Sequence, residues 1–343
     1  MKHTIKILAL ILALLMVLPL SLLACDKADE PSKDTEPQAQ APDKDLEIKI
    51  YALNGTTSMG MAQMIAKEKD GTDTMNYKIS LHAAADAITG AIVTGECAIA
   101  ALPTNAAANL YKKSEGKIQL LALNTLGVLY LLDTTGEVKS LSDLKGKTVY
   151  LPGAGSNPEF ITAALLEAAG LKVGEDVTLD TTSYNSPDAL QGAIIAGKAA
   201  IAVLPEPKVS VVTSQAQNVS VALDLTAEWE TINGKNTLVQ GCLVVNTKFA
   251  KEHPAELAQF LKDYEASVNF IKDGSDEAIT MIVEAGILPK APIAKKALPK
   301  CNLCFIAGED MKPVMTVFCE KMNAVNKKAV AAVPDDGFYY VAK

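Results

Sequence analysis

An internal repeat constrains this chain more than any other feature of its sequence. Residues 86–103 read DAITGAIVTGECAIAALP and residues 188–205 read DALQGAIIAGKAAIAVLP, and eleven of the eighteen aligned positions are identical. Each copy predicts a helix, a glycine turn at Gly95 or Gly197, and a short apolar strand that ends in Leu-Pro. A helix-strand unit that occurs twice predicts two similar lobes, each with its own sheet.

The repeat continues upstream in a looser form. Residues 48–52 and 148–151 predict strands, and each is followed by a polar loop and an amphipathic helix. Alternating strands and helices are typical of a mainly parallel sheet. The sequence therefore predicts an α/β fold with two lobes, each a mainly parallel sheet flanked by helices, joined by two crossing segments.

The lobe boundaries follow from where the two copies begin and end. We expect the first crossing within residues 126–147 and the return near Gly241–Asn246. Lobe 1 is then expected to consist of residues 46–130 plus 246–343, and lobe 2 of residues 131–245.

The first residues predict export from the cytoplasm. Two lysines precede an apolar run from Ile7 to Leu23, the layout of a secretory signal peptide, here residues 1–24. The run ends Leu-Leu-Ala-Cys25, which resembles a bacterial lipobox and predicts lipidation of Cys25. Residues 25–45 then form a lipid anchor and flexible tether, rich in charge and proline. An uncleaved membrane anchor is the alternative, and both place the body outside the cytoplasm.

Charge excludes one class of function. All 32 basic residues are lysines, there is no arginine, and the net charge is −8. A nucleic-acid-binding protein is expected to have a basic, usually arginine-bearing face, so we expect no nucleic-acid partner.

The number and spacing of the cysteine and histidine residues argue against a metal or redox centre. Cys301-Asn-Leu-Cys304 has the CxxC spacing, but it lies in an apolar run, residues 301–306, that predicts a buried strand. Residues three apart on a strand lie about 10 Å apart, beyond disulfide range. Only His82 and His253 follow the leader, without spaced partner ligands. We therefore expect no metal and no cofactor.

One motif resembles a known group of proteins. The run Lys139-Ser-Leu-Ser-Asp-Leu-Lys-Gly-Lys-Thr-Val149, followed by a strand and Gly155-Ser156, resembles the second-lobe entry of substrate-binding proteins of ABC importers. More narrowly it is similar to the nitrate/sulfonate/taurine-type group with the type II periplasmic-binding fold. The resemblance covers residues 46 to the C-terminus.

That resemblance implies a function and partners. It implies an extracytoplasmic, membrane-anchored solute-binding lipoprotein, expected to be a monomer, that captures a small organic molecule in an interlobe cleft. The molecule would be delivered to an ABC permease and its ATPase. A ligand-sensing module for a membrane receptor would bind in the same way and stays an alternative.

Candidate ligand-binding residues follow from the rule that ligands of open α/β sheets lie beyond the carboxyl ends of the strands. They occupy two polar loops, two Leu-Pro corners and two further positions expected in loops after strands. They are Thr56, Thr57, Ser58, Thr104, Asn105, Asn124, Ser156, Asn157, Tyr184 and Glu206.

Several of these residues also have a purely structural interpretation. Thr57 or Ser58 fits a helix cap, and Ser156 with Glu159 fits a capping box, in which case the glutamate would occupy the anion site itself. Glu206 could accept a hydrogen bond from an amine or ring N–H of the ligand, or be a solvated loop charge. Tyr184 could stack on a flat ligand or pack on the lobe surface.

The missing arginine also bears on the ligand. Sulfonate and carboxylate are often bound by the bidentate arginine fork, which this chain lacks. A neutral or amine-bearing solute is therefore favoured over a sulfonate. A secreted enzyme is the remaining alternative, but the chain has no Gly-x-Ser-x-Gly, His-Glu-x-x-His or phosphate-loop motif, so we expect no catalysis.

Overall fold

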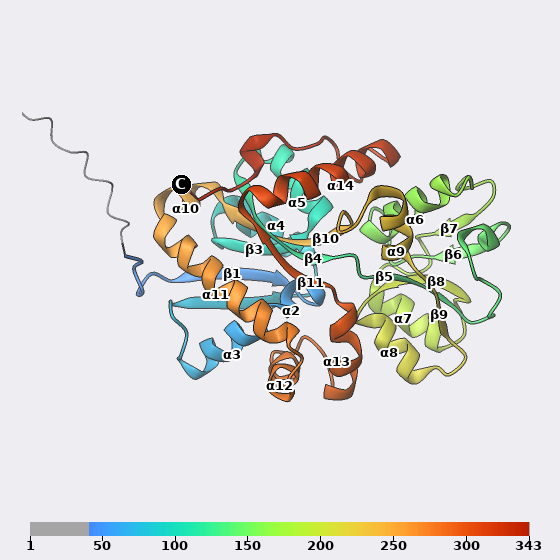
Figure 1. Cartoon of the computed structure of the whole chain (residues 1–343), viewed down its shortest axis with the longest axis horizontal. Coiled ribbons are helices and arrows are strands. Elements are labelled where there is room, and N and C mark those ends of the chain that lie inside the picture. The colour runs from blue at the N-terminus through green and yellow to red at the C-terminus, as the bar shows by residue number, and fades with distance from the viewer. Residues whose placement is uncertain (1–40, 343) are drawn as a thin grey trace, which may run out of the picture. The chain divides into compact units, whose positions relative to one another are not determined.

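The computed structural model describes residues 41–342, which form two β-sheets flanked by helices (Figure 1). The predicted signal peptide, Cys25 and the tether up to residue 40 lie outside the described residues. In the described part of the chain, no helix is both long and apolar enough to cross a membrane.

The first sheet has six strands in the order β11-β4-β10-β3-β1-β2. Their bounds are β1 Ile48–Leu53, β2 Tyr77–His82, β3 Ile99–Pro103, β4 Ile118–Leu126, β10 Val239–Asn246 and β11 Leu303–Ala307. The second sheet has five strands in the order β7-β6-β8-β5-β9. Their bounds are β5 Leu129–Asp133, β6 Thr148–Tyr150, β7 Thr178–Asp180, β8 Ile201–Pro205 and β9 Ser220–Asp224.

Helices connect and cover the strands. The helices that precede the second sheet in the chain are α2 Thr56–Met59, α3 Ala62–Asp70, α4 Ala85–Thr94 and α5 Thr104–Lys113. The helices that follow strands of the second sheet are α6 Asn157–Ala168, α7 Pro187–Ile195, α8 Lys208–Gln215 and α9 Leu225–Asn233. The C-terminal ones are α10 Thr247–Glu252, α11 Pro254–Lys272, α12 Asp276–Glu284, α13 Ala291–Ala297 and α14 Met311–Val325. Short 3-10 turns are η2 Leu141–Leu144, η3 Leu298–Lys300, η4 Gly308–Asp310 and η5 Asp336–Phe338.

Both sheets are mixed, with most strands running in one direction. In the first sheet β1, β2, β3 and β4 run the same way, while β10 and β11 run against them. In the second sheet β6, β7, β8 and β9 run together and β5 runs against them. The predicted α/β fold with two helix-flanked sheets is confirmed.

The internal repeat folds as the sequence predicts. Its copies form α4 with β3, and α7 with β8. Both strands have four buried residues followed by a half-buried proline, the pattern of a strand covered on both faces. Gly95 and Gly197 have φ of 82° and 70°, the left-handed conformation that favours glycine after a helix.

The two crossings between the sheets differ in length but lie close to each other, since the Val128 amide bonds Gln240 at the start of β10. The first consists of Gly127 and Val128, because β4 ends at Leu126 and β5 begins at Leu129. The return runs through α9 and is complete at Val239. It therefore precedes Gly241–Asn246, where we expected it. Those residues belong to β10, which pairs with β3 and β4 in the first sheet, because their buried apolar side chains suit a central strand. The exact lobe boundaries remain a prediction.

Polar contacts hold the first crossing in place. The Val128 amide donates to Gln240 Oε1 (2.6 Å), and the Leu126 amide donates to the Asn302 carbonyl (3.0 Å). Asn302 Nδ2 in turn donates to the Gly127 carbonyl. Residues from three separate parts of the chain thus fix the backbone that joins the sheets.

The five described cysteines are buried and free. Cys301 precedes β11 rather than lying within it, because Asn302 has a φ of 41°, which interrupts the expected strand. Burial raises the pKa of Cys304 and of Cys319 to about 12, so both remain neutral thiols at pH 7. Their role in this structure is packing.

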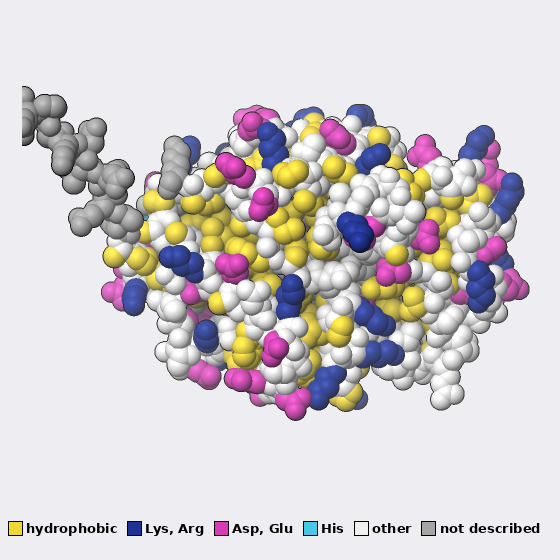
Figure 2. Space-filling view, in the orientation of Figure 1, with side chains coloured by type: hydrophobic (Ala, Val, Ile, Leu, Met, Phe, Trp, Pro, Cys, Tyr) yellow, Lys and Arg dark blue, Asp and Glu magenta, His cyan; other side chains and the backbone are white. Residues whose placement is uncertain are grey.

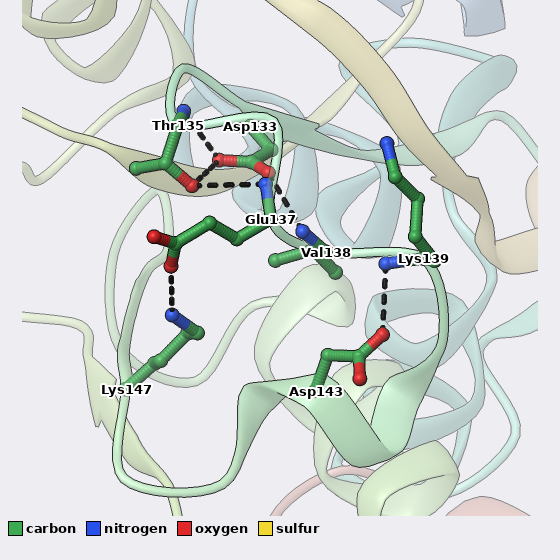
Figure 3. A network of polar contacts seen from close by, with 7 residues as sticks. All are labelled: Asp133, Thr135, Glu137, Val138, Lys139, Asp143 and Lys147. Atoms are coloured by element: carbon green, nitrogen blue, oxygen red, sulfur yellow. Dashed lines mark hydrogen bonds and ion pairs between the residues drawn. The ribbon is translucent and has the colours of Figure 1, made fainter.

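A polar network organises the corner that enters the second sheet (Figure 3). The buried carboxylate of Asp133 accepts hydrogen bonds from the Thr135 amide (2.7 Å), the Thr135 hydroxyl (2.7 Å) and the Val138 amide (2.9 Å). Ser140 and Asp143 form a capping box around η2. The motif that carries the family resemblance is therefore a structural corner in this chain.

We predict that Gly127→Ala destabilises the fold by about 1–3 kcal/mol, because overpacking a filled site forces neighbours to move. An added Cβ would overlap the Thr226 side chain and approach its Cβ to 2.8 Å. Urea unfolding monitored by circular dichroism measures the loss. Gly90→Ala in α4 is the matched control, since nothing lies within 4 Å of its added Cβ; equal stability of the two variants would contradict the prediction.

We predict that Asp133→Asn lowers the free energy of unfolding at pH 7 by about 1–3 kcal/mol. Burial alone would raise the pKa of Asp133, but the donors of Val138 and Thr135 outweigh it and hold this pKa below its ordinary value. A lowered pKa stabilises the fold above the unfolded-state pKa of about 4, and the contribution is lost as the pH falls. The wild type and variant should therefore converge in stability as the pH falls through the lowered pKa of Asp133; a difference that stays constant with pH would contradict this account.

Candidate ligand-binding site

The carboxyl ends of the same-direction strands define one edge of each sheet. In the first sheet Gly241 pairs with Pro103, and Val239 pairs with Leu126. The loop after β1, the start of α5 and the end of β4 therefore lie along the same edge. In the second sheet Leu129 pairs with Pro205, and Tyr130 with Asp224, so the ends of β8 and β9 lie beside the start of β5. The crossing at Gly127 and Val128 joins these two edges directly.

Three predicted residues of the first sheet lie close together. Asn124 Nδ2 donates to the Thr57 carbonyl (3.0 Å), and a Cβ on Gly241 would lie 2.6 Å from Asn124 Oδ1 and 2.8 Å from Thr57 Cγ2. Thr104 Oγ1 donates to the Val239 carbonyl (2.6 Å) on the neighbouring strand. Glycine at position 241 is thus what allows the polar side chains to approach β10.

Asn124 lies in a different setting from the one we expected. It is within β4 rather than in a loop after a strand, because β4 continues to Leu126 through its pairing with β10. Burial raises the pKa of Tyr264, and the Asn124 side chain acts against this shift. The signal that could have revealed this cluster is Gly241, a glycine inside a mostly apolar strand.

In the second sheet, the loop after β6 brings Ser156 and Asn157 to the start of α6. Ser156 Oγ donates to the Gly153 carbonyl (2.8 Å), and Glu159 Oε2 accepts from the Gly155 amide (2.5 Å). The expected capping box of Ser156 with Glu159 is therefore absent, since each side chain bonds within the preceding loop. Asn157 is 8% exposed, and its Oδ1 has no hydrogen-bond partner within residues 41–342.

Glu206 is buried and bonded to its own helix. It is 1% exposed; its Oε2 accepts from the Ser210 amide and its Oε1 from the Ser210 hydroxyl, both at 3.0 Å. Burial raises the pKa of Glu206, while the Ser210 donors and the charges of Lys300 and Lys296 oppose the rise. The carboxylate is not a solvated loop charge, which was one of the two interpretations open from the sequence.

The predicted residues differ in how enclosed they are. Tyr184 contacts Tyr150 edge-on, with ring centroids 5.7 Å apart, so it packs on the surface of its own lobe. The buried predicted residues are Thr57, Ser58, Thr104, Asn105, Asn124, Asn157 and Glu206, and the half-buried ones are Thr56, Ser156 and Tyr184.

Two pockets lie elsewhere, and none of the ten predicted residues lines either of them. The larger, about 840 Å³, lies at the opposite edge of the first sheet, between the starts of β3 and β4 and helix α10. Lys117, Lys248 and Lys251 line it. The smaller, about 250 Å³, lies beside the first crossing, next to Leu126 and Asn302. Sequence reasoning did not find the larger pocket, whose lining carries no motif. A cleft shared by Thr57 and Asn157 remains a prediction.

The described residues hold no group of three or more His, Cys, Asp or Glu side chains arranged to bind a metal ion. What the two edges offer is hydroxyl, amide and carboxylate groups that can make hydrogen bonds. This chemistry suits reversible binding of a polar solute.

Comparison with known proteins agrees with this architecture. Residues 115–278 match the family described as NMT1/THI5 like. No curated protein matches the chain. Among solved structures, an ABC transporter protein from Parabacteroides distasonis is similar with a TM-score of 0.73 and 24% identity, covering 88% of this chain and 100% of that one.

Two sulfonate-binding proteins are also similar. The periplasmic aliphatic sulphonate binding protein SsuA from Escherichia coli has a TM-score of 0.69 and 15% identity, covering 87% of this chain and 92% of that one. The alkanesulfonate-binding protein SsuA from Xanthomonas axonopodis pv. citri, solved with MOPS, has a TM-score of 0.65 and 13% identity, covering 86% and 96%. The resemblance stated from the sequence is therefore confirmed: the chain is similar, over nearly nine-tenths of its length, to binding proteins of ABC transporters and has their fold.

Proposed function

We propose that this protein is an extracytoplasmic solute-binding lipoprotein of an ABC importer. It captures a small organic molecule between the carboxyl edges of its two sheets and delivers it to a membrane permease. Lipidation at Cys25 holds it at the membrane. It acts by binding and release, without catalysis.

The observation that carries the proposal is an unsatisfied buried group in the loop region that follows β6 of the second sheet. Asn157 Oδ1 is enclosed by protein yet has no partner within the described residues. Leaving a buried polar atom without a hydrogen bond costs about 1–3 kcal/mol. A solute that donates to this oxygen would remove that cost, so the structure is suited to a bound molecule there.

Two further features support the same function. The fold is that of proteins described as sulfonate-binding or ABC-transporter components. The leader and its Leu-Leu-Ala-Cys25 end predict a protein held outside the cytoplasm. Together they favour a binding protein that works beside a membrane importer.

Thermal-shift screening of the purified protein against a metabolite library tests this function. A ligand at 100 times its Kd adds about 2.7 kcal/mol to the folded state, which is measured as a rise in melting temperature. Thr57→Ala, Asn157→Ala and Glu206→Ala should each reduce that rise by weakening the ligand contacts at one edge.

Thr94→Ala is the matched control for Thr57→Ala, because both hydroxyls donate to a backbone carbonyl four residues earlier, whereas Thr94 lines the 840 Å³ pocket at the opposite edge of the sheet. It should leave the ligand-induced rise intact. A rise that survives all three edge substitutions, or that disappears only in Thr94→Ala, would show that the site lies elsewhere.

A further inference from the structure

The first sheet with its helices, here the first lobe, meets the second sheet with its helices, the second lobe, on both faces of the sheets. On one face a single apolar cluster includes residues of both lobes. On the other face each lobe has its own apolar cluster, to which α13 contributes in the first lobe and α8 in the second. The helices α13 and α8 contact each other. Their contact therefore joins two separate cores.

A polar bond joins these two helices. Lys296 Nζ of α13 donates to Thr213 Oγ1 of α8 (2.8 Å). Lysine side chains are visible over α13 and α8 on the face shown in Figure 2. A hydrogen bond between exposed side chains contributes little by itself, so the strength of this contact depends on the groups beside it.

Glu206 lies at the joint between the lobes. Its backbone amide donates to the carbonyl of Val128 (2.9 Å), one of the two residues of the first crossing. Its carboxylate is 1% exposed and accepts from the amide and the hydroxyl of Ser210 in α8. A carboxylate in this position has lost most of its water, which disfavours its negative charge.

Two lysines of the first lobe offset that loss. Burial raises the pKa of Glu206; the Ser210 donors oppose this rise, and so do the charges of Lys300 in η3 and Lys296 in α13. Cys301 belongs to the apolar cluster of the first lobe, and burial, then the charge of Glu206, raises its pKa. Groups of the first lobe thus lie close enough to act on a carboxylate of the second.

We propose that Lys296 and Lys300 are positioning residues that hold the two lobes together through the charge of Glu206. When α13 and α8 move apart, the lysines leave Glu206 and its carboxylate meets water. The lysines therefore favour the closed arrangement, and the desolvation of the carboxylate disfavours it. The inference rests on the proposed function, because closing on a solute is what gives a binding protein a use for such a contact.

Substitutions of the two kinds of charge should act in opposite directions. Lys296→Gln combined with Lys300→Gln leaves the buried carboxylate without its offset and should raise the ratio of open to closed protein about threefold. Glu206→Gln removes the charge that closure desolvates, keeps the shape of the side chain, and should lower this ratio. With Glu206→Gln present, the two lysine substitutions should have no further effect, because they act through that charge.

Pulsed electron paramagnetic resonance on protein dialysed free of small molecules measures this ratio. Nitroxide labels on Asp70→Cys, at the end of α3, and on Lys198→Cys, just before β8, report the distance between the lobes; both positions are exposed. The five described cysteines are buried. Cys25→Ser in every sample removes the remaining thiol, so the labels attach to the introduced cysteines alone.

Lys295→Gln is the matched control for the lysine substitutions. Lys295 is the neighbour of Lys296 on α13, but its Nζ pairs with Asp276 of α12 (2.7 Å), within the first lobe. This variant should leave the distribution of distances unchanged.

Three results would overturn the inference: shifts in the same direction for the lysine and Glu206 variants, a lysine effect that persists with Glu206→Gln, or distances that no substitution alters. Neither lysine is buried, so the lysine variants keep the test decisive if Glu206→Gln fails to fold. The measurement uses no solute. A metabolite screen without a ligand would therefore contradict the proposed function, while the distances test the contact by themselves.

Discussion

The two-residue crossing between β4 and β5 is the constraint on which the rest of this structure depends. Only Gly127 and Val128 separate the strands, so the carboxyl end of β4 and the amino end of β5 lie at most about 10 Å apart. Because β5 runs against β8 and β9, its amino end lies beside their carboxyl ends. The two edges that α/β sheets use for ligands are therefore joined to each other by the shortest strand-to-strand connection in the described residues.

The helices that bridge the sheets have different chemistry on the two sides of this crossing. On one side α14 packs on α6, and its Phe318 contacts Trp229 of α9, within an apolar cluster that also includes Met315. On the other side α13 meets α8 through the bond from Lys296 to Thr213. Methionine tolerates altered packing because its side chain is unbranched and flexible. The contact on one side therefore depends on apolar packing, and the contact on the other includes a hydrogen bond between exposed side chains.

The sequence predicted the parts of this fold that depend on local pattern. These parts are the repeat, its glycine turns and the strands that end at Pro103 and Pro205. The strands could be predicted because burial on both faces leaves a continuous apolar run in the sequence. The sequence could not predict which sheet β10 joins, since a mostly apolar strand fits either one. It also did not predict that Asn124 lies inside a strand. The amide of Asn157 was predicted as a contact, but its lack of a partner depends on three-dimensional neighbours that no local pattern encodes.

The repeat also shows where the two halves differ. Eleven identities extend through Leu102-Pro103 and Leu204-Pro205 and stop there: the next residues are Thr104-Asn105 in one half and Glu206-Pro207 in the other. The identical positions are those that pack each strand between helices. The first position beyond the strand changes from a hydroxyl that bonds a neighbouring strand to a buried carboxylate that bonds its own helix. Packing thus requires the same residues in both halves, while the first residues beyond the two strands differ in charge.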